Sequence, residues 1–279
     1  MVFDDLLTLR PTDAPNRWIC EFSSHVLTPR GTLQGGAGLA AALLATERVA
    51  GRPTFWATAQ YLSFASGTAP VELEVTIEAA GHNTTQARCV LLREGVEVLT
   101  AHAALGSRPF GPDATWVDRP VVPPPDDCPP FDFFAADRGD LGEITELRLA
   151  SGRQIRDLKG EPGGSTTAFW CRLSLGRHAV GVGELAFIGD LLPLGFCEPY
   201  GAPYAGTSID NTIRVGQRTE TEWVLIDCRM EQVANGFGYG RAHLWSEDGL
   251  LLGTASQTMV MRIDTRRNDL HSRPPIRDA

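Results

Sequence analysis

The stretch QGGAGLAAALLA, residues 34–45, decides the fold, because its run of alanine and leucine predicts one helix that continues to about residue 50. No carboxylate occurs in this helix before Glu47, near its end. Two glycines, Gly35 and Gly36, open the helix. They form either a tight turn into it or a surface that a ligand can approach closely, and both interpretations stay open here.

Strand-like segments surround this helix. One such run, residues 17–27, precedes the helix, and four more follow it at residues 54–64, 71–79, 84–92 and 96–105. These runs are rich in β-branched and aromatic residues and are separated by short polar or glycine-containing turns. The pattern predicts one helix followed by an antiparallel meander.

The second half of the chain repeats this order. A strand-like run at residues 168–180 is followed by a helical run at 183–192 and by further strands at 206–216, 222–231, 238–246 and 250–262. Aligning the hairpin glycines Gly95 and Gly249 gives an offset of 249 − 95 = 154 positions. The same offset places Thr100 and Ala101 on Thr254 and Ala255. The sequence therefore predicts two copies of the same structural unit.

A segment of different composition separates the two units. Eight prolines fall between Pro109 and Pro130, and the stretch GEPGG closes the segment at residues 160–164. This composition is typical of a connector, with one short helix expected near residues 141–150. We therefore predict an N-terminal domain at 1–107, a connector at 108–164, a C-terminal domain at 165–266 and a tail at 267–279.

Composition excludes several classes of protein. The chain has 25 basic and 34 acidic residues and a net charge of −9, which disfavours general attraction to nucleic acid or anionic lipid. Its apolar runs are far below the roughly 18 residues of a membrane span, and its acidic start is unlike a signal peptide. The six cysteines are well separated, which favours buried free thiols over metal ligands. We expect a soluble, cytoplasmic protein without metal or cofactor.

Short sequence motifs narrow the class of protein further. The stretches LAFIGDLLP (residues 185–193), TSID (207–210) and TASQTMVMR (254–262), with QGGAGLAAAL in the first half, resemble motifs of the acyl-CoA thioesterase II (TesB-like) family. The resemblance covers nearly the whole chain. It implies an α+β fold of two tandem hotdog domains, each a long helix wrapped by an antiparallel sheet, packed as a pseudo-dimer.

The resemblance also implies a set of site residues. In that family an Asp on the second helix, a Thr or Ser on the next strand and a Gln on the last strand bind and activate a water. Carried over, these are Asp190, Ser208 and Gln257. The chemistry fits, because a carboxylate can accept the water's proton while the hydroxyl and amide orient the water. The helix start at Gly35 and Gly36 offers backbone N–H groups to a developing oxyanion.

The internal repeat predicts a single working site. At the offset of 154, Ser208 corresponds to Thr54, but Gln257 corresponds to Ala103, and the first helix carries no carboxylate before Glu47. The first half therefore lacks two of the three groups. Without Ser208 and Gln257, the carboxylate of Asp190 would be read as a structural ion-pair or capping group.

Other sequence motifs lack the structural context that their usual function requires. The stretch GVGELA, residues 181–186, fits a dinucleotide fingerprint, but antiparallel strands follow it, and no nucleophile elbow of the form G-x-S-x-G occurs. Of the histidines only His178, just before the second helix, is near a predicted element of the site, and a structural role is favoured.

We thus expect hydrolysis of an acyl-CoA substrate to a free acid and CoA. Two alternatives remain. One is an acyl-CoA-binding hotdog protein without catalysis. The other is an acyl-thioester hydratase or dehydratase, whose D-x-N-P-x-H pattern this sequence lacks. Hotdog sheets leave edges that invite pairing, so a homo-oligomer is a further expectation.

Overall fold

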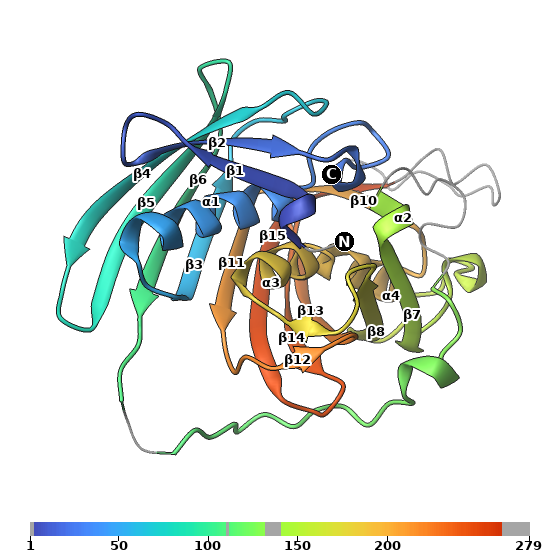
Figure 1. Ribbon diagram of the computed structural model, residues 1–279. Coiled ribbons are helices and arrows are strands. Elements are labelled where there is room, and N and C mark those ends of the chain that lie inside the picture. The colour runs from blue at the N-terminus through green and yellow to red at the C-terminus, as the bar shows by residue number, and fades with distance from the viewer. Residues whose placement is uncertain (1–2, 110–111, 132–140, 264–279) are drawn as a thin grey trace.

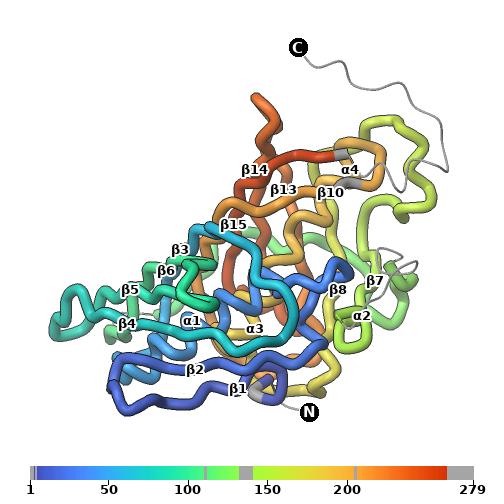
Figure 2. Tube along the Cα trace, turned by 90° about the horizontal axis from the view of Figure 1, so that it is seen from above, coloured from blue at the N-terminus to red at the C-terminus, as the bar shows by residue number. Residues whose placement is uncertain are grey.

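One large antiparallel sheet runs through both halves of the molecule. The computed structural model describes residues 3–109, 112–131 and 141–263, without the side chains of residues 4, 204, 205 and 263. The sheet has 13 strands in the order β1-β2-β4-β5-β6-β3-β11-β15-β14-β13-β8-β7, with β10 also on β15. Helices α1 and α3 lie together in the hollow of this curved sheet (Figures 1 and 2). The predicted hotdog architecture is confirmed.

The elements divide between the two halves. The first half contains η1 (Phe3–Asp5), β1 (Leu7–Pro11), β2 (Arg17–Phe22), η2 (Ser24–Val26), α1 (Gly35–Ala50), β3 (Thr54–Tyr61), β4 (Val71–Ala80), β5 (Thr84–Arg93) and β6 (Val96–Gly106). The middle contains η3 (Pro125–Asp127), α2 (Leu141–Ile144), β7 (Thr145–Ser151) and η5 (Ile155–Asp157). The second half contains β8 (Thr166–Leu173), β9 (His178–Ala179), α3 (Val182–Gly189), η6 (Leu192–Phe196), α4 (Cys197–Tyr200), β10 (Tyr204–Ser208), β11 (Asp210–Val215), β12 (Glu220–Thr221), β13 (Val224–Ala234), β14 (Phe237–Ser246) and β15 (Leu251–Ile263).

The predicted connector differs from the structure in one respect. The helix expected at residues 141–150 is only four residues long, and the chain continues as strand β7, which pairs with β8. An alternation of buried and partly exposed side chains explains the strand, because Leu147 and Leu149 are buried while their neighbours are partly exposed. Strands β1–β6 lie before residue 107 and β8–β15 after residue 165, although the domain boundaries themselves stay a prediction. The tail predicted at 267–279 lies outside the described residues.

Helix α1 is the centre of the first half. The Gln34 side chain accepts a hydrogen bond from the Ala37 N–H at its start, and Gly51, with φ +62°, ends it in the left-handed conformation that favours glycine. The residues from Gly36 to Leu43 are buried on every side of the helix. Such a helix is stabilised by packing within the protein rather than by an exposed polar face.

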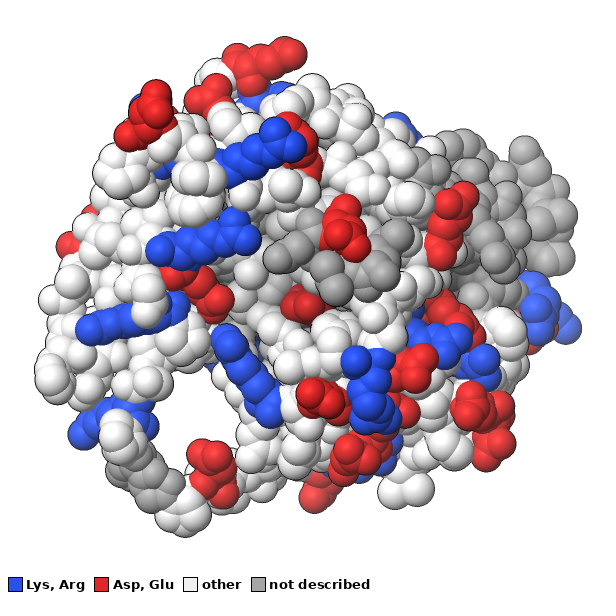
Figure 3. Space-filling view, in the orientation of Figure 1, with Lys and Arg blue, Asp and Glu red and all other residues white. Residues whose placement is uncertain are grey.

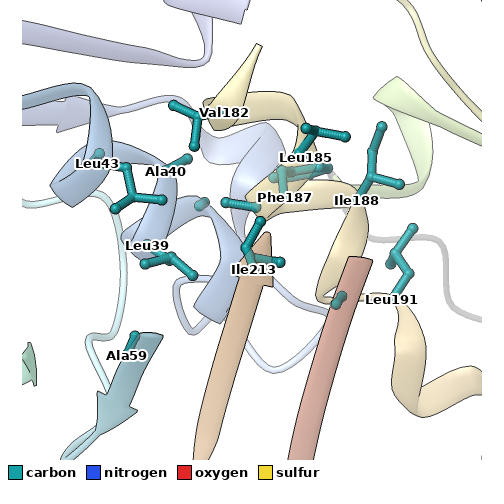
Figure 4. Close-up of a cluster of buried hydrophobic side chains, with 14 of the residues drawn as sticks. Leu39, Ala40, Leu43, Ala59, Val182, Leu185, Phe187, Ile188, Leu191 and Ile213 are labelled. Carbon is teal, nitrogen blue, oxygen red and sulfur yellow. The ribbon is translucent and has the colours of Figure 1, made fainter. Parts of the chain in front are cut away.

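Helix α3 packs antiparallel to α1. Near its start Gly183 contacts Leu44, close to the end of α1, and near its end Phe187 contacts Gly36, at the start of α1. Leu39, Ala40 and Leu43 of α1, Val182, Leu185, Phe187 and Ile188 of α3, and Ala59 and Ile213 of the sheet form the buried cluster drawn in Figure 4. The start of one helix therefore meets the end of the other above the sheet.

The two halves join at strands β3 and β11, around a local pseudo-two-fold. Thr58 pairs with Thr212, and their hydroxyl oxygens are 2.8 Å apart. Trp56 pairs with Arg214 and Gln60 with Asp210, so the symmetric positions differ by 210 − 56 = 154 and 214 − 60 = 154. The offset predicted from the sequence thus relates the two central strands.

Three predictions from composition can be compared with the structure. All six cysteines are buried and free, as expected. On the face drawn in Figure 3, acidic and basic side chains of the described residues are interspersed, and no single-sign surface covers it. Among the helices that the structure describes, none is long and apolar enough to cross a membrane.

Candidate active site

Asp190 lies where α3 ends. The helix begins at Val182, and the Glu184 side chain accepts a hydrogen bond from the Gly181 N–H at 3.0 Å. Asp190 is its C-cap, and Pro193 lies in the next turn, η6. This position carries the carboxylate to the start of α1, away from His178, which lies 3.3 Å from Glu184 at the opposite end of α3.

Both oxygens of the Asp190 carboxylate accept a hydrogen bond. The Gln257 Nε2 amide donates to Oδ1 at 2.8 Å, and the backbone N–H of Gly36 donates to Oδ2 at 2.8 Å. Gln257 is buried, whereas Asp190 keeps some exposed surface. Each carboxylate oxygen retains a second lone pair, so the group can still accept a proton or a hydrogen bond from a water.

Ser208 extends this network by one step. Its hydroxyl donates to Oε1 of Gln257 at 3.2 Å, so the amide presents its oxygen to Ser208 and its nitrogen to Asp190. Strand β10 carries Ser208 and pairs with β15, which carries Gln257. The three residues named from the sequence therefore form one hydrogen-bonded chain in the order Ser208, Gln257, Asp190.

The surroundings of Asp190 change its acidity. Burial raises the pKa of the Asp190 carboxyl from 3.8 to about 6, against the hydrogen bonds from Gly36 and Gln257, which lower it. The helix ends act in opposite directions as well, because the end of α3 disfavours a negative charge and the start of α1 favours one. A carboxylate with this pKa is mostly ionised at neutral pH and is still a useful base.

The role expected of Gly36 needs a correction. Its N–H group binds the Asp190 carboxylate, so it is not free to serve a substrate oxyanion as the sequence suggested. A Cβ on Gly36 would lie 2.5 Å from the Ala186 carbonyl oxygen and 2.7 Å from Asp190 Cβ. Glycine is required there because the two helices and the acid meet too closely for any side chain.

Gly35 has a similar steric role. A Cβ on Gly35 would lie 3.0 to 3.1 Å from the ring and hydroxyl of Tyr61. The adjacent glycines therefore leave room for two side chains, Tyr61 against Gly35 and Asp190 against Gly36. The sequence did not identify Tyr61.

Two further residues near the site, Gln34 and Asn211, are not predicted from the sequence. The buried Gln34 side chain caps α1 and also donates from Nε2 to the Phe187 carbonyl at 3.1 Å, which fastens the start of α1 to α3. Asn211, on β11, is fully buried. Its signal in the sequence is the repeat itself, since the offset of 154 places this amide opposite Ala57 in the other half.

Known proteins agree with this fold. Residues 125–261 match the family model of the acyl-CoA thioesterase C-terminal domain. A solved candidate thioesterase from Novosphingobium aromaticivorans is 28% identical, with a TM-score of 0.80 over 91% of this chain and 98% of that one. A hotdog protein of unknown function from Alicyclobacillus acidocaldarius is 21% identical, with a TM-score of 0.81 over 94% and 98%. The acyl-CoA thioesterase II TesB2 of Mycobacterium marinum is 17% identical, with a TM-score of 0.73 over 94% and 99%.

These findings define the class first: residues 125–261 match the acyl-CoA thioesterase C-terminal domain, and the chain has the hotdog fold that TesB-like structures share, as the sequence resemblance predicted. The family match and the 28% identical structure support acyl-CoA thioester hydrolysis in the general sense. No curated protein sequence matches the chain.

Proposed function

We propose that Asp190 is the general base that activates a water for attack on the thioester carbonyl of an acyl-CoA. The observation that carries this proposal is the carboxylate of the half-buried Asp190 at the junction of α1 and α3, held by Gln257 and Gly36, with its pKa raised by burial to about 6. A positioned base of matched pKa typically contributes about 10² to 10⁴ in rate.

In the proposed reaction Asp190 first accepts one proton and then returns it. Asp190 takes a proton from water while the water oxygen bonds to the carbonyl carbon, and the carbonyl π electrons move to oxygen. The oxyanion then re-forms the C=O bond and expels the CoA sulfur, which receives the proton from Asp190. The products are the carboxylic acid and CoA thiol, and Asp190 returns to its ionised form.

Gln257 and Ser208 would position this base. Because Gln257 binds Asp190 and Ser208 binds Gln257, the chain fixes both the rotation of the amide and the direction of the carboxylate. The free lone pairs of the Ser208 oxygen can accept a hydrogen bond from the same water. We infer one site for each chain, because Ala103 occupies the position that corresponds to Gln257 and cannot supply such a bond.

The test is Asp190→Asn, assayed for thiol release with short, medium, long, branched and aromatic acyl-CoAs. An asparagine can keep the Gly36 hydrogen bond, and a rotated Gln257 amide can keep the other. We expect kcat to fall by about 10² or more while the fold survives. Equal, slow hydrolysis by both proteins would instead favour an acyl-CoA-binding protein without catalysis.

A further inference from the structure

Two buried polar side chains close to Asp190 have unused hydrogen-bonding capacity. The Tyr61 hydroxyl and the Asn211 amide interact with each other, but not with the geometry of a normal hydrogen bond, and neither forms such a bond with any other described residue. Leaving a buried donor unpaired costs about 1–3 kcal/mol, so such groups are rare unless they serve a ligand or a water. Asn211 has no exposed surface at all.

Strand register places both groups beside the proposed base. Asn211 pairs with Ala59 on β3, two residues before Tyr61, so the Tyr61 and Asn211 side chains are diagonal neighbours on the helix-facing side of the sheet. Thr212 pairs with Ser256, which makes Asn211 and Gln257 neighbours one position further along these antiparallel strands. The Tyr61 ring packs on Gly35, directly before the glycine that binds Asp190.

The other half of the molecule shows that the fold does not need these polar groups. At the offset of 154, Asn211 corresponds to Ala57 and Tyr61 to Val215. Ala57 is fully buried and pairs with Ile213, so an apolar contact fills the symmetric position on β3 and β11. Polar side chains occur only in the copy of this arrangement that also has Asp190 and Gln257.

The proposed hydrolysis has one further chemical requirement. The carbonyl oxygen becomes an oxyanion during attack, and it needs hydrogen-bond donors already in place. Gly36 cannot be that donor while its N–H group binds Asp190. Burial, together with the nearby Asp190 charge, raises the pKa of Tyr61 well above its ordinary value of 10, so its hydroxyl stays protonated and able to donate.

We propose that the thioester carbonyl enters between these two side chains when acyl-CoA binds, and that the Tyr61 hydroxyl and the Asn211 Nδ2 amide then donate hydrogen bonds to its oxygen and stabilise the oxyanion. This inference rests on the proposed function, because it assumes that Asp190 activates the attacking water. The two donors would lie on β3 and β11, so each half of the chain contributes one. The base and the donors then approach the reacting carbonyl from the helices and from the sheet.

The first experiment compares Tyr61→Phe and Asn211→Ala with the wild type. Tyr61→Phe removes only the hydroxyl, and Asn211→Ala copies the residue at position 57. We expect Tm to stay the same or rise in both variants, while kcat/KM falls about 10²- to 10³-fold for each donor, mainly through kcat. The control is Tyr239→Phe, an exposed tyrosine on β14, which should change neither quantity.

Binding of analogues separates oxyanion stabilisation from a merely structural role. A trifluoromethyl-ketone analogue of an acyl-CoA, hydrated in water to a tetrahedral diol, should bind each variant more weakly in proportion to its loss of kcat/KM. A thioether analogue, in which CH₂ replaces the carbonyl, should bind all proteins equally. The inflection of the pH–rate profile near pH 6 should persist in Tyr61→Phe, because Asp190 is unchanged.

The outcomes distinguish the oxyanion proposal from the proposed role of Asp190 as the base. If the wild type is active and Asp190→Asn is not, but both donor variants stay within threefold of wild-type kcat/KM, the oxyanion proposal is overturned while the role of Asp190 stands. A fall in Tm for both variants, or unchanged affinity for the ketone analogue, also overturns it. If Asp190→Asn is fully active, the proposed function itself fails.

Discussion

Asp190 Oδ2 accepts a 2.8 Å hydrogen bond from the backbone N–H of Gly36, a residue from the other half of the chain. The end of one helix thus holds the acid, and the start of the other helix holds a donor to it. Neither half can form this arrangement alone. The consequences for activity and stability can be tested separately.

The first prediction concerns the pH dependence of catalysis. Because the base must be ionised, kcat/KM should rise about tenfold for each pH unit below the pKa of Asp190 and level off above about pH 6. Initial rates of thiol release between pH 4.5 and 8.5 measure this profile. A profile that is flat across pH 6 would contradict the assignment of Asp190 as the base.

The second prediction concerns the stability of Asp190→Asn. Because the pKa of Asp190 is raised on folding, the ionised acid opposes folding, and this penalty is absent below about pH 4, grows as pH rises through 6, and is constant above. A rise from 3.8 to about 6 corresponds to a limit of about 3 kcal/mol, so the variant should be more stable than wild type by about 1–3 kcal/mol at pH 7.5.

Chemical denaturation of both proteins at pH 4 and at pH 7.5 measures that difference. The two free energies of unfolding should converge at the lower pH. A variant that is less stable than wild type at pH 7.5 would indicate that the carboxylate is a structural group.

The third prediction compares two glycines in α1. Gly36→Ala should lower the free energy of unfolding by about 1–3 kcal/mol or more and reduce activity, because its Cβ would meet the Ala186 carbonyl oxygen and Asp190. Gly38→Ala is the matched control. Its Cβ meets mainly a terminal methyl of Leu99, at 3.0 Å, and alanine favours the helix by about 1 kcal/mol.

Thermal melts and kcat/KM of the two variants provide the comparison. Gly38→Ala should remain close to wild type in both. Equal effects at the two positions would show that general crowding of α1, rather than the contact with Asp190, governs the result.

The fourth prediction concerns the order of the hydrogen-bonded chain. Gln257→Ala should reduce kcat more than Ser208→Ala, because only Gln257 contacts the base directly. If Ser208 acts through Gln257, adding Ser208→Ala to Gln257→Ala should have little further effect. Kinetics of the two single variants and the double variant test this, and fully additive losses would mean that Ser208 acts independently.

Much of this arrangement could be predicted from the sequence, and the reason is periodicity. The repeat offset from hairpin glycines matches the register of the central strands, and the motif resemblance brought Asp190, Ser208 and Gln257 to one place. Strand β7 is not predicted from the sequence, because the proline-rich composition around it favours a connector and its short alternation is not distinctive.

The roles of Gly36 and Tyr61 could not be predicted in the same way. Contact between the two helices depends on how they pack across the sheet, and a glycine pair alone does not reveal which neighbour needs the space. In the sequence Asn211 is an ordinary strand residue, and only the structure shows that its amide is fully buried without a hydrogen bond of normal geometry.

The Thr58–Thr212 pair has one more consequence. In a dimer of identical chains, every substitution next to such an axis appears on both sides, so an amide gained on one strand would also be imposed on its mate. Within a single polypeptide the two sides mutate independently. Asn211 can face Ala59 on one side of the axis while Ala57 faces Ile213 on the other. Joining the halves in one chain thus permits a division of labour in which one side specialises for chemistry and the other is free to become plain scaffold.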